Sequence, residues 1–94
     1  MNQDEARRLI EEQLASYREK PYAELVKMIG EGPFTGEFAS PAGTAYQYEI
    51  DVLWDGKPNG DVRVLGSIDD GGWRAFCPLC SDFVKGRDDG LIGE

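Results

Sequence analysis

The sequence predicts a single two-layer α+β domain, with N-terminal helices packed on one face of a four-stranded antiparallel β-meander. Apolar residues recur every three or four positions up to residue 30, which is the period of a helix. From residue 34 to residue 78 they alternate with polar residues, which is typical of strands with one buried face. The 94 residues suffice for one domain with one modest core, so we take residues 1–94 as a single unit.

The helical region, about residues 3–29, divides into one long and one short helix. Ile10 and Leu14 belong to the apolar stripe of the first helix. Pro21 interrupts this helix, because proline disrupts a helix interior but fits the first turn of a new helix. A second apolar stripe follows the proline, and Gly30 ends it.

The meander is expected over about residues 34–78. In its second hairpin, placing Ile50 opposite Val64 keeps the apolar side chains of both strands on one face. The same register sets Asp51 beside Arg63 on the other face. The expected strands cover residues 34–38, 46–54, 62–68 and 73–77.

The last hairpin is predicted from its turn. Asp70-Gly71 is a dipeptide typical of a two-residue type I′ turn, which places Val64 opposite Cys77. Beyond this hairpin, residues 81–94 read as a tail that begins with a short helical stretch and continues as coil rich in glycine and aspartate.

Composition excludes several classes of function. The chain has 18 acidic residues, 10 basic residues and no histidine, for a net charge of −8. Nucleic acids are bound by lysine and arginine, and anionic membranes attract the same side chains, so we expect neither as a partner. Without histidine there is no histidine-based catalysis, and we expect no enzyme, no catalytic residue and no cofactor. No leader and no long apolar run is seen, so the expected location is cytoplasmic.

Cys77-Pro-Leu-Cys80 has the spacing of a redox pair or of half a tetrahedral zinc site. Thioredoxin-type motifs begin a helix within a βαβ unit, whereas this one follows the last expected strand. Zinc would need two further ligands, which a symmetric dimer could supply by pooling two cysteine pairs, or which Asp55, Asp61 or Asp82 could provide. We favour the simpler interpretation of a small core residue and a nearby thiol, with thiol or metal function as the alternative.

Glu49 and Asp51 are neighbours on one face of a strand, about 7 Å apart, a spacing that resembles a pair of catalytic carboxylates. Both point outward, close to Arg63 and Arg74. Solvated carboxylates beside arginine are weak acids and bases at neutral pH, so we expect a salt-bridged surface here.

The outward face of the sheet is the leading candidate for function. Its centre holds Leu65 and Phe76 side by side within a rim of both charges, which is typical of a modest protein interface and suits two-fold self-association. Alternatively, Leu91 and Ile92 of the tail cover this face. We therefore predict a non-enzymatic interaction module that forms a homodimer. The expected interface residues are Leu65, Phe76, Arg63, Arg74, Glu49 and Asp51.

An acidic inhibitor or immunity-type binder of a basic partner is a further alternative. After residue 30 the chain has twelve acidic and five basic residues, and complementary charge steers association.

The segments Leu65 to Leu79 and Val52 to Val64, with the Gly-Leu-Ile-Gly-Glu94 ending, resemble small uncharacterised bacterial proteins with a cystatin-like shape. The resemblance covers roughly the last fifty residues and implies a fold without an activity. The Gln-x-Val-x-Gly loop with which cystatins enter cysteine proteases is absent, so protease inhibition is not implied. The related ketosteroid-isomerase-like cone needs a longer chain to enclose its pocket.

Overall fold

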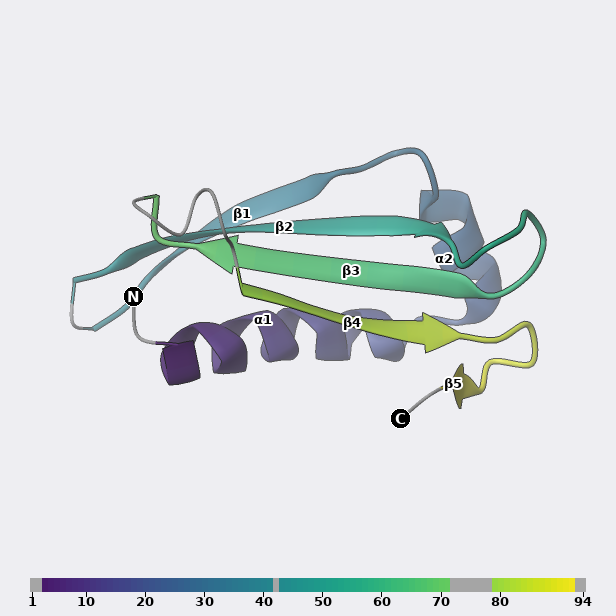
Figure 1. The fold of residues 1–94 in the computed structure, drawn as a ribbon, viewed down its shortest axis with the longest axis horizontal. Coiled ribbons are helices and arrows are strands. Elements are labelled where there is room, and N and C mark those ends of the chain that lie inside the picture. Colours follow the sequence, from purple (N-terminus) through teal and green to yellow (C-terminus); the bar gives the residue numbers. More distant parts are fainter. Residues whose placement is uncertain (1–2, 42, 72–78, 93–94) are drawn as a thin grey trace.

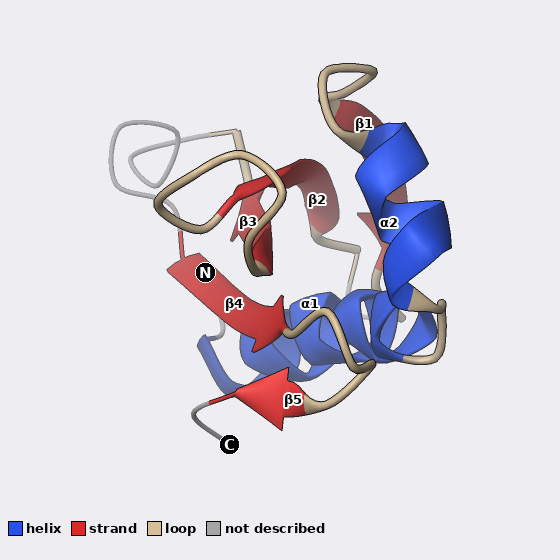
Figure 2. Ribbon diagram, turned by 90° about the vertical axis from the view of Figure 1, so that its right-hand side faces the viewer, coloured by secondary structure: helices blue, strands red, loops and turns tan. Residues whose placement is uncertain are grey.

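The structure, a computed structural model, describes residues 3–41, 43–71 and 79–92. It has the predicted α+β class, with two helices against one face of an antiparallel sheet (Figure 1; Figure 2). The five strands follow one another across the sheet in chain order. The elements are α1 (Gln3–Arg18), α2 (Tyr22–Met28), β1 (Phe34–Ala39), β2 (Ala45–Trp54), β3 (Val62–Asp69), β4 (Leu79–Lys85) and β5 (Leu91–Ile92).

The helices confirm the predicted long and short segments. Ala6, Ile10 and Leu14 of α1 are fully buried against β3 and β4. Pro21 stands at the N-cap of α2, which buries Leu25 against the sheet. Of the described helices, neither has both the length and the apolar character that crossing a membrane requires.

The register between β2 and β3 differs from the prediction by two residues. Ile50 lies opposite Gly66, and Val64 lies opposite Val52 rather than Ile50. The missing side chain at Gly66 makes room for α1, since a Cβ there would lie 2.9 Å from Cδ1 of Ile10. A shift of two residues keeps every side chain on its predicted face, so alternation alone could not detect it.

The same shift changes the pairs on the outer face. Asp51 lies opposite Leu65, and Arg63 lies opposite Leu53. The prediction that Asp51 and Arg63 lie directly opposite each other is therefore wrong.

The fourth strand is the larger correction. Val64 pairs with Phe83 of β4, not with Cys77. The stretch 73–77, expected as the fourth strand, lies outside the described residues, and β4 occupies the edge of β3 on which it was expected to pair. The stretch 81–85, expected as a short helix, belongs to β4. Phe83 is only 3% exposed, so this pairing adds a large apolar side chain to the core.

The Asp70-Gly71 turn does not make a two-residue hairpin. Gly71 has a φ of +80°, and its N–H donates to Oδ1 of Asp69 at 2.8 Å. The turn chemistry is therefore present, but Ile68 pairs with Leu79 of β4 and not with a residue directly after the turn.

Two residues near the end of the chain hold the junction between the helices. Lys85, only 4% exposed, donates from Nζ to the backbone oxygens of Arg18 and Lys20, at 2.5 and 2.6 Å. Oδ1 of Asp89 accepts a hydrogen bond from the N–H of Tyr22 at 2.5 Å. A cation thus meets the C-terminal end of α1 and an anion the N-terminal end of α2, as the helix dipoles favour. We call Lys85 and Asp89 the clamp.

Candidate functional site

The face of the sheet opposite the helices is the candidate site, and we call it the open face. It carries the odd-numbered residues of β1, β2 and β3 and the even-numbered residues of β4, as the alternation of burial indicates. Both helices pack on the other side of these strands. The charged residues of the open face are Glu37, Glu49, Asp51, Asp69, Asp82 and Arg63, and its leucines are Leu53 and Leu65.

The structure brings most of the expected interface residues together. Those that lie on the open face are Glu49, Asp51, Arg63 and Leu65. Phe76 and Arg74 lie outside the described residues. The predicted contact between Leu65 and Phe76 thus stays a prediction, and β2 and β4 supply the described neighbours of Leu65, which are Asp51 and Asp82.

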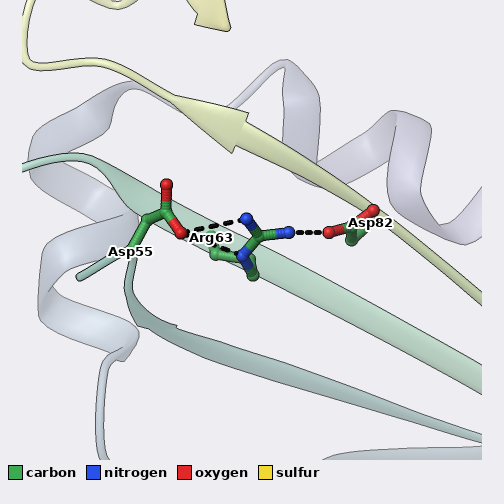
Figure 3. A network of polar contacts seen from close by, with 3 residues as sticks. All are labelled: Asp55, Arg63 and Asp82. Carbon is green, nitrogen blue, oxygen red and sulfur yellow. Dashed lines mark hydrogen bonds and ion pairs between the residues drawn. The ribbon is translucent and has the colours of Figure 1, made fainter. Parts of the chain in front are cut away.

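From the sequence, Arg63 is expected to contribute a positive charge to the rim of a protein interface, but in the structure acidic residues of the same chain already bind it. Its Nη2 and Nε lie 2.9 and 3.1 Å from Oδ1 of Asp55, and Nη1 contacts Asp82 (Figure 3). One guanidinium is thus held between two carboxylates of the same chain. Among the described residues, the expected rim of mixed charges is therefore predominantly acidic.

A shallow hollow of about 430 Å³ lies on the part of the open face that spans β1, β2 and β3. Three carboxylates, those of Glu37, Glu49 and Asp69, belong to its lining, and none of its described lining residues is basic. We call it the acidic hollow. Its other lining residues are Thr35, Gly36, Gln47, Tyr48 and Ser67.

A second hollow, also of about 430 Å³, lies where β2 continues beyond the start of β1. Leu53, which is 39% exposed, and Leu65 line it on the sheet side, and Ile29 lines it from the segment before β1. Asp51 is its acidic member. We call it the apolar hollow, and its remaining lining residues are Gly30, Gly32 and Val52.

The described geometry does not support the alternative that Cys77 and Cys80 form a redox pair or bind a metal. Cys77 lies outside the described residues, and Cys80 is exposed on β4. Within the described ranges, no three side chains of the metal-binding types gather closely enough to hold an ion. Asp55 and Asp82, which were candidate helpers of the cysteine pair, contact Arg63 instead.

Asp82 belongs to the open face, although the sequence predicts that residues 81–85 form a short helical stretch at the start of a tail. The predicted meander ends near residue 78, so it does not include this segment. The alternation of Leu79, Ser81 and Phe83 was the signal for a strand. Comparisons with protein-family models, with curated proteins and with solved structures find no match for this chain, so the open face is interpreted from its own geometry.

Proposed function

We propose that this protein is a small non-enzymatic binding module whose open face takes up a basic segment of a partner protein. The observation that carries the proposal is the charge of that face. Five carboxylates point outward from its described positions, whereas the guanidinium described there, that of Arg63, is engaged by Asp55 and by one of the five, Asp82. Complementary charge accelerates encounter and discriminates between partners, so lysine- and arginine-rich segments are favoured.

The same charge argues against a second copy as the main occupant. A two-fold axis through the open face would set one array of carboxylates against another, and like charges across an interface are unfavourable. We therefore favour the basic partner over the homodimer that the sequence suggested. The cystatin-like assignment stays a prediction, supported by a long helix that packs on one face of an antiparallel meander (Figure 1).

The apolar hollow completes the proposed surface. Binding energy in protein interfaces concentrates in a few anchors that fill pockets, and arginine is frequent among them. A long basic side chain has an apolar stem that suits Leu53 and Leu65 and a cationic end that suits Asp51. The two hollows together thus match a segment that mixes cationic and apolar groups.

The test uses a charge-neutral variant of the open face, Glu49→Gln with Asp69→Asn. The asparagine oxygen can still accept the hydrogen bond from Gly71 that Asp69 accepts now. The matched control, Asp4→Asn with Glu12→Gln, removes two exposed carboxylates from α1. Partners captured from an extract of the source organism are purified, and their binding to the three proteins is measured by calorimetry at low and high salt.

We expect the open-face variant to weaken the partner's affinity on the order of tenfold, and the control to leave it unchanged. The wild-type affinity should fall as salt rises, because salt screens exposed charges. A partner that binds all three proteins equally overturns the proposal. Light scattering on the wild type and on Leu65→Arg adds a second check, since a dimer that this substitution dissociates would establish self-association instead.

A further inference from the structure

We propose that the partner's segment binds as an added strand along the free edge of β1, with basic and apolar residues alternating along it. This inference rests on the proposed function and specifies how the open face would be used. β1 is the terminal strand of the described sheet, and its other edge pairs with β2 over all six residues. Strand addition to such an edge is a known mode of peptide recognition.

The backbone of β1 is arranged for such an addition. In the turn between β1 and β2, the N–H of Ser40 donates to the oxygen of Thr44 at 2.8 Å. Because hydrogen-bonded pairs alternate along an antiparallel ladder, Phe34, Gly36 and Phe38 direct their backbone groups toward β2. The N–H and C=O groups of Thr35 and Glu37 therefore point to the free edge.

On the open-face side, an added strand would lie beside the acidic hollow. Glu37 is the outward carboxylate of β1, and Glu49 is opposite Thr35 on β2. Neighbouring strands are about 4.8 Å apart, so a lysine or arginine on the added strand reaches both carboxylates. The charge of the hollow thus selects basic residues at alternate positions.

On the inner side, the same strand would meet aromatic rings. Phe38 is half-buried and stacks on Tyr48, with ring centroids 5.1 Å apart. The ring of Tyr48 extends across Gly36, where any Cβ would overlap it. The helices pack mainly on β2, β3 and β4, so this side of β1 has apolar surface that a further strand would cover. The side chains that face inward from the added strand should therefore be apolar.

The sequence of β1 lacks the usual protection of a free edge. Edge strands commonly carry lysine, proline or a bulge that blocks further pairing. Phe34–Ala39 contains neither lysine nor proline, and it pairs with β2 without a bulge. Its only charged residue is Glu37, which repels acidic strands and attracts basic ones. At the opposite side of the sheet, β5 pairs with the end of β4.

The probe is a synthetic ten-residue peptide of alternating arginine and valine, blocked at both ends. A comparator has the same sequence with every backbone nitrogen methylated, which keeps the charge and removes the hydrogen bonds of an added strand. Binding is measured at low salt, and amide hydrogen exchange is followed by NMR for Thr35 and Glu37. The amide of Asp82, which points away from β3, is the internal control.

We expect the parent peptide to slow exchange at Thr35 and Glu37 on the order of tenfold, and methylation to weaken binding by at least a similar factor. Glu37→Lys should abolish the protection, whereas Glu12→Lys on α1 should preserve it. Equal binding of both peptides, or protection at Asp82 instead, overturns strand addition. If the open-face variant weakens both peptides equally, the proposed function stands and only the added strand is lost. If neither peptide binds, strand addition is overturned, and calorimetry with the captured partner decides the function separately.

Discussion

The two faces of one sheet differ sharply in what their side chains do. On the inner face, Ile50, Val64 and Ile68 are fully buried, and Lys85, the buried charged residue among those described, donates hydrogen bonds to the backbone oxygens of Arg18 and Lys20. On the open face, most of the described charged residues are carboxylates, and three of them, Glu37, Glu49 and Asp69, line one hollow. Like charges on one surface oppose folding, so folding alone does not explain the open face. The difference separates residues that hold the fold from residues available for binding.

The largest effect should come from exchanging one apolar residue on each face of β3. Ile68→Ala removes a fully buried side chain, and we expect it to lower the free energy of unfolding by about 2–5 kcal/mol. Leu65→Ala, on the open face of the same strand, should cost less than about 1 kcal/mol. Urea denaturation of both variants makes the comparison. Equal losses would show that the open face is covered in the folded protein.

The second test addresses Lys85, the buried cation on the inner face. Lys85→Met keeps the apolar stem but leaves the carbonyls of Arg18 and Lys20 without a donor, so we expect a loss of about 1–3 kcal/mol. Lys57→Met, at an exposed loop position, is the control and should stay within about 0.5 kcal/mol of wild type. If the two variants unfold at the same urea concentration, the clamp does not stabilise the junction.

A smaller effect of opposite sign is expected on the open face. Glu49→Gln removes one charge from the acidic array and should raise the free energy of unfolding by a few tenths of a kcal/mol at low salt. The gain should vanish at high salt, where exposed charges are screened. Glu12→Gln on α1 is the matched control. A destabilised Glu49→Gln would mean that this carboxylate supports the fold.

The smallest effect appears only in alkaline solution. Burial raises the pKa of Tyr17 above its ordinary value of 10.0, and the nearby Tyr48 adds to the shift, whereas Lys20 opposes it. Above pH 10 the unfolded chain therefore loses a proton that the folded protein keeps, so stability falls as the pH rises toward the folded pKa. Absorbance titration of wild type and Tyr17→Phe measures this. A titration of Tyr17 at or below pH 10 would contradict the burial.

The features that could be predicted from the sequence are those that depend on the spacing of apolar residues within one helix or strand. The two helices and the inward faces of β2 and β3 follow from apolar spacing, and both are confirmed. The pairing of Ile50 with Gly66 was not predictable, because it depends on how closely Ile10 approaches from α1. The apolar spacing also did not identify β4, because Leu79 and Phe83 are four residues apart and would share one face of either a helix or a strand.

The candidate site was predictable in position but not in charge. Glu49, Asp51, Arg63 and Leu65 share a face in any register that keeps the apolar residues inside. The acidic character of that face depends on long-range pairing, which brings Asp82 from β4 to Arg63. No local pattern in the sequence contains that contact.

The clamp also has a consequence for biosynthesis. Lys85 and Asp89 lie at least 65 residues after the helix ends that they contact. Both helices are therefore synthesised long before the residues that contact their junction. The partners of α1 in β3 and β4 also follow only from residue 62 onward. Contacts of such sequence separation form late and slowly, so the nascent N-terminal half should wait unfolded until β4 has been synthesised. In a nascent chain stalled on the ribosome before Lys85, we therefore expect the segments of α1 and α2 to be cleaved readily by proteases.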